Sequence, residues 1–204
     1  MPEDPVEHLT TDLSKIDFEK LRKEFAKGRK RTYVERLRSI TQYRIRELVR
    51  LNKSRVDYMK HLQAMIDDYN EGRMNVDQFF EALVQLMTEL DEEEKRHAEE
   101  SLTEEELAVF DLLTRPPDKL ARKNKELVKK VARDLLRTLK EGKLVLDWRK
   151  TQQTRAAVRQ AIEVELDRLP EVYPKELYEQ KCELVYQHVY ESYWGKNQSV
   201  YGSS

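Results

Sequence analysis

The 204-residue chain is poor in the residues that interrupt helices. It contains only 5 glycines and 6 prolines, whereas 38% of its residues are charged. Its many Leu, Glu, Lys and Arg residues favour helices, and the shortage of breakers allows those helices to be long. The composition therefore predicts an all-α fold, which we expect to be an irregular bundle of about seven helices.

Cysteine and long apolar runs are also scarce. The single cysteine, Cys182, excludes a disulfide framework and a cysteine-based zinc site, which favours a reducing cytoplasm. No run approaches the ~20 apolar residues that cross a bilayer, so we expect no membrane association. The acidic, proline-containing residues 1–7 do not resemble a signal peptide.

The formal net charge of −1 conceals a blockwise distribution. Residues 11–60 carry 16 Lys and Arg against 7 Asp and Glu, and residues 111–160 carry 15 against 6. Residues 61–110, between them, carry 3 against 15. The basic blocks can meet phosphate or an acidic protein, or they can face the chain's own acidic block.

Breakers divide the chain into expected segments. Residues 1–13 should form a flexible lead-in and residues 196–204 a disordered tail. The Pro116-Pro117 pair predicts a boundary between an N-terminal helical half, 14–115, and a C-terminal helical half, 116–195.

Three capping patterns predict helix starts within these halves. Ser54 has an acid three residues later, and Asn75 is a typical N-cap residue. Thr103 with Glu106 forms a T-x-x-E capping box.

The first binding candidate lies on a helix expected from about Trp148 to Leu169. Positions spaced by three or four residues share one stripe of such a helix. Arg, Gln and an aromatic residue on one stripe suit contact with phosphate or with an acidic partner helix. Alternatively, the tryptophan belongs to the core and the cations form a solvated face. The candidate residues are Trp148, Arg149, Lys150, Gln152, Arg155 and Arg159.

Other surface candidates are weaker. The outer face of a helix over 119–140 carries several cations, for which a solvated face is the favoured interpretation. Aromatic residues near the end of the chain could anchor an interface or belong to the core; they are Tyr186, Tyr190, Tyr193 and Trp194. A second basic set that could touch DNA phosphates consists of Arg29, Lys30, Arg31, Arg36 and Arg38.

Catalytic motifs are incomplete. There is no glycine-rich phosphate loop. Asp118, Glu141 and Lys143 match the PD-(D/E)xK nuclease signature. However, the intervening residues favour a helix that would separate the acids by roughly 33 Å at ~1.5 Å per residue. Glu94-x-x-His97 is one half of a di-iron motif that lacks its second copy. We therefore expect no catalytic residue, metal or cofactor in this chain.

Several long strings resemble one known family. They are IDFEKL (16–21), LTEEELAVFDLLTRP (102–116), LDWRKTQQTRAAVRQAI (146–162) and LYEQKCELVYQHVY (177–190). Over about residues 11–195 the chain resembles the C-terminal region of type I restriction enzyme R subunits.

The resemblance implies a place in a larger machine. R subunits are ATP-dependent site-specific deoxyribonucleases, with a nuclease domain, two helicase-like motor domains that use ATP and Mg²⁺, and a helical C-terminal region. That last region is thought to attach the subunit to the modification methyltransferase. The family's catalytic motifs are missing here, so no catalytic residue carries over.

Two functions follow as expectations. The chain would be a non-catalytic assembly module whose partners are the methyltransferase and specificity subunits and the motor domains of its own subunit. The alternative is an auxiliary module that contacts the backbone of duplex DNA.

Overall fold

The computed structural model describes residues 17–115, 122–171, 173–196 and 198–202. Across these ranges the predicted all-α class is confirmed. There are eight α-helices rather than about seven, together with a 3-10 turn and one short two-stranded hairpin.

The chain folds as two compact units. Unit 1 contains the described residues up to Val49 and residues 55–96, and unit 2 contains residues 50–54 and those from His97 onward. The predicted boundary at Pro116-Pro117 lies outside the described residues. The compact units divide the chain elsewhere, near the ends of two long helices.

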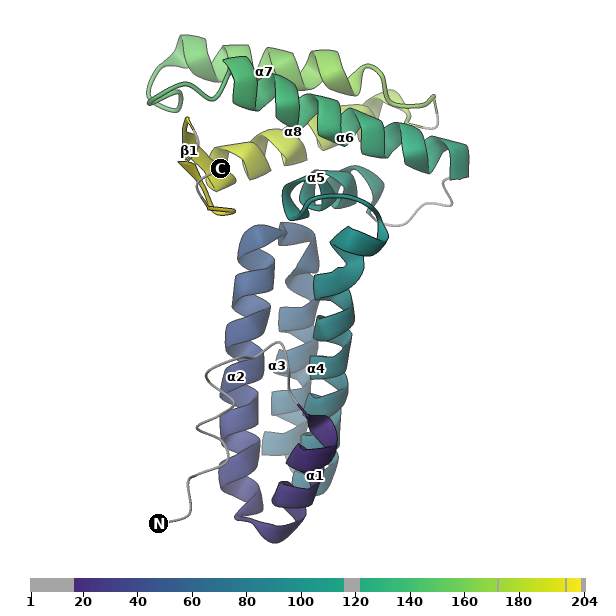
Figure 1. Ribbon diagram of the computed structural model, residues 1–204, viewed down its shortest axis with the longest axis vertical. Helices are drawn as coiled ribbons and strands as arrows, with labels where there is room; N and C mark the ends of the chain where they lie inside the picture. The colour runs from purple at the N-terminus through teal and green to yellow at the C-terminus, as the bar shows by residue number, and fades with distance from the viewer. Residues whose placement is uncertain (1–16, 116–121, 172, 197, 203–204) are drawn as a thin grey trace. The chain divides into compact units, whose positions relative to one another are not determined.

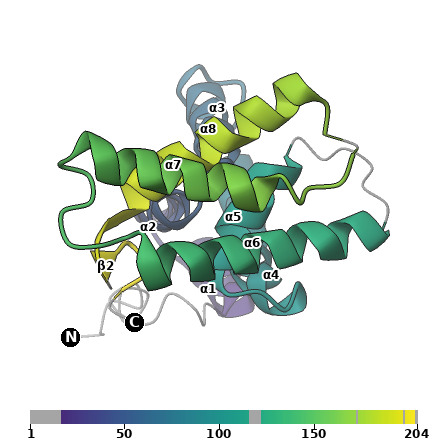
Figure 2. The ribbon, with the colours of Figure 1, turned by 90° about the horizontal axis from the view of Figure 1, so that it is seen from above.

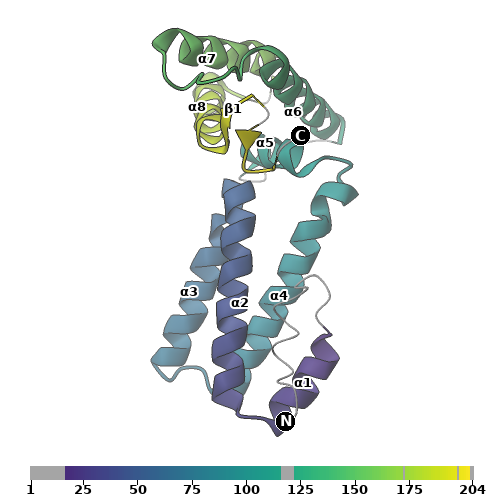
Figure 3. The same ribbon diagram turned by 60° about the vertical axis from the view of Figure 1, so that its left-hand side comes forward.

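Unit 1 is built from four helices. They are α1 (Phe18–Lys27), α2 (Lys30–Leu51), α3 (Val56–Asn70) and α4 (Val76–Glu99), with a 3-10 turn, η3 (Lys53–Arg55), before α3. Figures 1 and 3 show α2, α3 and α4 running side by side, with the short α1 at one end. Their shared core includes two stacked aromatic pairs, Phe25 with Phe80 and Tyr69 with Phe79.

Of the two capping predictions in this region, one is confirmed and the other is wrong. Asn75 is confirmed, because its side chain accepts a hydrogen bond from the Gln78 amide at 2.9 Å. The Ser54 prediction is wrong, because α3 begins at Val56 after Arg55, with no side-chain cap. The Ser54 hydroxyl donates instead to the side-chain oxygen of Asn52 at 2.7 Å.

Buried arginines tie α2 and η3 to the acidic half of α4. Arg44, only 4% exposed, pairs with Asp91 at 2.7 Å and Glu94 at 2.8 Å. Burial by itself would lower the pKa of Arg44, but the two carboxylates outweigh it and raise that pKa. Arg55, fully buried, donates to Glu93 at 2.8 Å. Much of the acidic block therefore meets cations of the first basic block.

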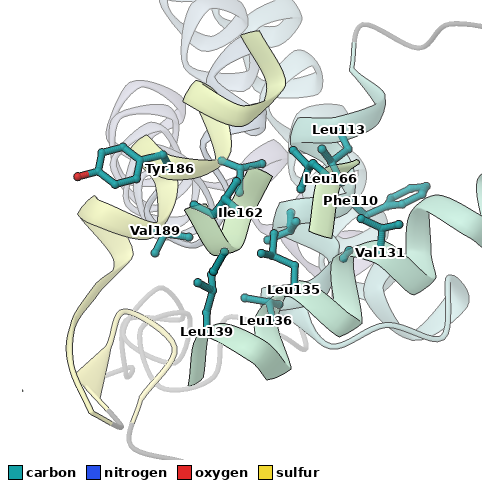
Figure 4. Packing of buried hydrophobic residues seen from close by; sticks show 14 of the residues in the cluster. Phe110, Leu113, Val131, Leu135, Leu136, Leu139, Ile162, Leu166, Tyr186 and Val189 are labelled. Atoms are coloured by element: carbon teal, nitrogen blue, oxygen red, sulfur yellow. The ribbon is translucent and has the colours of Figure 1, made fainter. Parts of the chain in front are cut away.

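Unit 2 is built from the other helices. They are α5 (Glu104–Thr114), α6 (Arg122–Gly142), α7 (Gln152–Leu166) and α8 (Lys175–Ser192), followed by β1 (Tyr193–Gly195) and β2 (Gln198–Ser199). Seen from above, α6 and α7 run side by side (Figure 2). Apolar residues of all four helices meet in one core (Figure 4), including Phe110, Leu135, Ile162 and Val189.

Helix α5 is capped at both ends. The predicted capping box is confirmed, with the Thr103 hydroxyl accepting from the Glu106 amide and the Glu106 carboxylate accepting from the Thr103 amide. At the other end, the buried ammonium of Lys181 donates to the carbonyls of Leu112 and Arg115 at 2.8 and 2.6 Å. Because those carbonyls have no partner within the helix, Lys181 replaces the missing hydrogen bonds.

Residues 50–54 belong to unit 2 because its side chains bind them. Asn52, fully buried, donates to the Asp111 carboxylate at 2.7 Å. Arg115 donates to the Ser54 carbonyl at 2.9 Å, and Lys53 pairs with Glu191 at 3.2 Å.

The end of the described chain is ordered, whereas the sequence predicted a disordered tail beyond residue 195. The strands β1 and β2 pair antiparallel. Beyond them, the Tyr201 hydroxyl donates to the Leu51 carbonyl at 2.6 Å and lies 3.1 Å from Nε2 of His188. The tail is therefore held by partners that its local sequence does not reveal.

The buried Arg55–Glu93 pair predicts a large effect of a small change. Glu93→Gln preserves side-chain size but removes the negative charge that the buried Arg55 and the neighbouring Arg96 both bind, so the free energy of unfolding should fall by about 3 kcal/mol. Urea denaturation measures this. Glu92→Gln, at an exposed position of the same helix, is the control and should change stability by less than ~0.5 kcal/mol. Equal effects of the two variants would contradict the role of the pair.

His188 predicts a pH dependence of stability. Burial lowers its pKa to about 4 from 6.5, against a raising effect of Glu191 and with a lowering effect of Lys53. The unfolded chain therefore takes up this proton at a higher pH than the folded chain. Stability from this group is full above pH 6.5 and should fall by about 3 kcal/mol as the pH drops to 4.

Urea titrations across that pH range test the assignment. His188→Gln should flatten this part of the profile, whereas the exposed His61→Gln should leave it unchanged. A profile that His188→Gln leaves as steep as before would refute the prediction.

Candidate partner-binding surface

Trp148 lies in the loop before α7 and not on the helix. It is fully buried, and its indole N–H donates to the Tyr193 carbonyl at 3.0 Å. Thr151 caps α7, so the helix begins at Gln152. The predicted stripe from Trp148 through Arg159 is therefore interrupted, because the tryptophan belongs to the core of unit 2.

The arginines beside Trp148 bind the protein's own backbone. Arg149 donates to the Tyr190 carbonyl at 2.9 Å and lies over the Tyr190 ring, 5.4 Å from its centre. Arg155 donates to the Arg149 carbonyl at 2.7 Å. The first hydrogen bond fastens the loop before α7 to α8, and the second fastens the same loop to α7.

The remaining candidates of this set differ in exposure. Arg159 pairs with Glu183 at 2.6 Å and stacks on Tyr186, which raises the pKa of the guanidinium mainly through the Glu183 hydrogen bond. Lys150 pairs with Asp147 at 2.9 Å. Gln152 is exposed in the first turn of α7.

The second basic set lies in unit 1, around the start of α2. Lys30 pairs with Asp77 at 2.5 Å and lies 5.4 Å from the centre of the Phe25 ring. Arg38 pairs with Glu35 at 2.7 Å. The other three are exposed: Arg29, Arg31 and Arg36.

Three lysines of α6 bind acids that lie just before α5 or in its first turn. Lys125 and Lys129 both bind Glu100, at 2.7 and 2.8 Å. Burial would raise the pKa of Glu100, but the two lysines outweigh it and lower that pKa. Lys140 binds Glu105 at 2.6 Å. These lysines neutralise acids of the same unit, whereas Lys130 and Arg137 of the predicted outer face are exposed, as the favoured interpretation of a solvated face expects.

The aromatic cluster near the end of α8 is mostly core. Tyr186 and Tyr193 are buried, and Tyr190 packs against that core. Trp194 is the exception, at 43% exposed.

The structure also exposes aliphatic residues that sequence reasoning missed. Val145 and Leu146 stand in the loop between α6 and α7, at 43% and 74% exposed. The Leu-Val-Leu run containing them is strand-like in sequence but too short to assign to an element. Its flanking charges were the one available hint of exposure.

Comparison with known proteins shows the family to which the chain belongs. The family model described as type I restriction enzyme HindI endonuclease subunit-like, C-terminal, matches residues 4–193. The chain belongs to this family.

A curated relative agrees with this assignment. The putative type I restriction enzyme MjaIXP endonuclease subunit of Methanocaldococcus jannaschii is 30% identical over 119 residues. The match covers 57% of this chain and 11% of that protein, so the chain spans about a tenth of its relative's length. No solved structure matches the chain.

The chain thus corresponds to the C-terminal region of a type I restriction endonuclease subunit. Its sequence offered two incomplete catalytic motifs. Asp118 is outside the described residues, and Glu141 is exposed at the end of α6. Glu94 pairs with Arg44, while Nδ1 of His97 lies 3.3 Å from the Leu102 carbonyl. None of the helices in the described ranges is both long and apolar enough to span a membrane.

The two tryptophans of this restriction-subunit region predict opposite outcomes. Trp148→Phe leaves a cavity and the Tyr193 carbonyl without its donor, so it should lower the free energy of unfolding by about 2 kcal/mol. Trp194→Phe, at the exposed position, should change it by less than ~0.5 kcal/mol. Urea denaturation followed by circular dichroism measures both. A larger loss from Trp194→Phe would contradict the burial assignment.

Proposed function

We propose that this chain is a non-catalytic assembly module that docks the motor part of a type I restriction endonuclease subunit onto the modification methyltransferase. Its partners are the methyltransferase and specificity subunits and the motor domains of its own subunit. ATP and Mg²⁺ would act in those motor and nuclease domains.

One observation carries this proposal over the DNA alternative. The cations that the sequence offers for phosphate contact are largely engaged within the protein. Arg149 and Arg155 bind backbone carbonyls, and Arg159 binds Glu183. A phosphate would have to compete with these partners, and that competition favours a protein-binding role for the surface.

An auxiliary role in DNA contact keeps one supporting observation. Arg29 and Arg31 are exposed at the turn between α1 and α2, on either side of the paired Lys30. Such side chains could touch phosphates of a duplex without base readout.

Binding to the cognate methyltransferase–specificity core tests the docking proposal. With the core immobilised, the chain should bind at moderate salt and compete with the intact endonuclease subunit for the same site. Biolayer interferometry measures the affinity and the competition. Binding that the intact subunit cannot displace, or no binding, would contradict the proposal.

A salt titration with duplex DNA tests the alternative. Each phosphate contact contributes a log–log slope of about −0.9, so the docking role predicts a slope shallower than about −1.8. A steeper slope that Arg29→Ala with Arg31→Ala reduces by about 1.8 would favour DNA contact. Lys130→Ala, at an exposed position of α6, is the matched control.

A further inference from the structure

The loop between α6 and α7 presents two aliphatic side chains to solvent. Its buried ends, Leu144 at 3% exposed and Trp148 at 0%, bracket Val145 at 43% and Leu146 at 74%. Among the large hydrophobic residues that the structure describes, none is more exposed than Leu146. Single exposed apolar residues are ordinary, so the surroundings of this pair decide whether it matters.

The loop is ordered by its own contacts. The Leu144 amide donates to the Leu139 carbonyl at 2.9 Å, and the Trp148 amide donates to the Val145 carbonyl at 3.2 Å. Asp147 has a φ of 58°, in the left-handed region that residues with a side chain rarely adopt. The anchored ends hold this conformation, so a partner would meet a preformed surface and binding would lose little entropy.

Trp194 lies at the same end of unit 2. The Trp148 indole binds the carbonyl of Tyr193, the residue before Trp194, and so fastens the loop to β1. Trp194 is exposed between the buried Tyr193 and Gly195, as the alternation along a strand requires. Figure 2 shows the hairpin and the α6–α7 loop at one end of the unit.

Two lysines flank these apolar residues in the sequence. Lys143 is the first residue of the loop and Lys196 follows β1, and within the described part of the chain neither has an acidic partner. Lys150 is paired with Asp147, the acid inside the loop. The charges that flank the apolar residues, two lysines and one Lys–Asp pair, therefore sum to a net positive charge.

We propose that Val145, Leu146 and Trp194, flanked by Lys143 and Lys196, form the docking surface for an acidic amphipathic helix of a partner protein. The apolar face of such a helix would bury the three exposed side chains, of which tryptophan is a frequent binding anchor. Its acidic residues would meet the two lysines at the rim. The inference rests on the proposed docking function, and it adds which residues dock and what kind of partner segment they bind.

Other occupants fit these residues less well. A duplex would place its charged backbone against Val145 and Leu146, whose burial needs an apolar face. In a two-fold dimer the surface would meet its own copy and bring the lysines of both protomers together. An acidic amphipathic helix satisfies the apolar residues and the lysines at once.

Paired substitutions in the complete chain test the surface against the methyltransferase–specificity core. Leu146→Ser with Trp194→Ser should weaken binding at least ~tenfold, because both anchors are lost. The matched control is Val164→Ser with Leu184→Ser, two positions on α7 and α8 that are 58% and 47% exposed. The control should bind within about twofold of wild type. Equal affinities of the two double variants would overturn the proposal.

A peptide probe tests the surface independently of the core. Trp148 is buried, so acrylamide quenching of tryptophan fluorescence reports chiefly on Trp194. A synthetic amphipathic helix of about 18 residues, with Leu on one face and Glu on the other, should protect Trp194 from quenching. The same peptide with Lys in place of Glu should not, and Lys143→Glu with Lys196→Glu should reverse this preference.

The two experiments separate the possible failures. If the core does not bind but the acidic peptide protects Trp194, the docking function fails and the surface stands. If neither peptide protects Trp194, or both do equally, the surface proposal is overturned. It is also overturned if duplex DNA protects Trp194 better than the peptide, or if wild type forms a dimer that Leu146→Ser dissociates.

Discussion

A hydrogen bond between two buried side chains, the amide of Asn52 and the carboxylate of Asp111, governs how this chain is divided. Burying either group without a partner would cost free energy, so each needs the other as its hydrogen-bond partner. Their pairing draws the five residues that follow Val49 into unit 2, where Arg115 and Glu191 hold them further. Unit 2 is consequently discontinuous in sequence, because residues 50–54 belong to it together with the residues from His97 onward.

Charge follows a similar logic. Many acids of the block between the two basic blocks form ion pairs inside the units. Their partners include Arg44 and Arg55 in unit 1 and Lys125, Lys129 and Lys140 in unit 2. A blockwise charge pattern is often taken as a sign of a nucleic-acid partner. In this protein it largely reflects internal neutralisation. A lysine that has no acidic partner and lies near exposed apolar groups therefore indicates a binding surface better than the total number of cations does.

The sequence predicted what local patterns determine. The helical class, the capping box at Thr103 and the family all follow from composition, short-range spacing or ordered strings. It failed where the partner lies far along the chain. Ser54 looks like a helix cap, but its hydroxyl donates to Asp111, 57 residues away, as well as to the nearby Asn52. Trp148 looks like a helix residue, but its indole binds a carbonyl 45 residues away. The Leu-Val-Leu run at 144–146 does not show by its sequence that Leu144 is buried whereas Leu146 is exposed.

The hydroxyl of Tyr201 closes on the carbonyl of Leu51 across 150 positions of the chain. During synthesis, the carbonyl emerges long before its donor, and so does Asn52 before Asp111. After the end of α2 has been synthesised, about 60 residues are translated before Asp111 is available to Asn52. Tyr201 becomes available to Leu51 only after 150 residues. Non-local closure of this kind slows folding. A fragment that starts after the acidic block would lack residues 50–54, and a fragment that stops before Tyr201 would leave Leu51 without its hydroxyl donor.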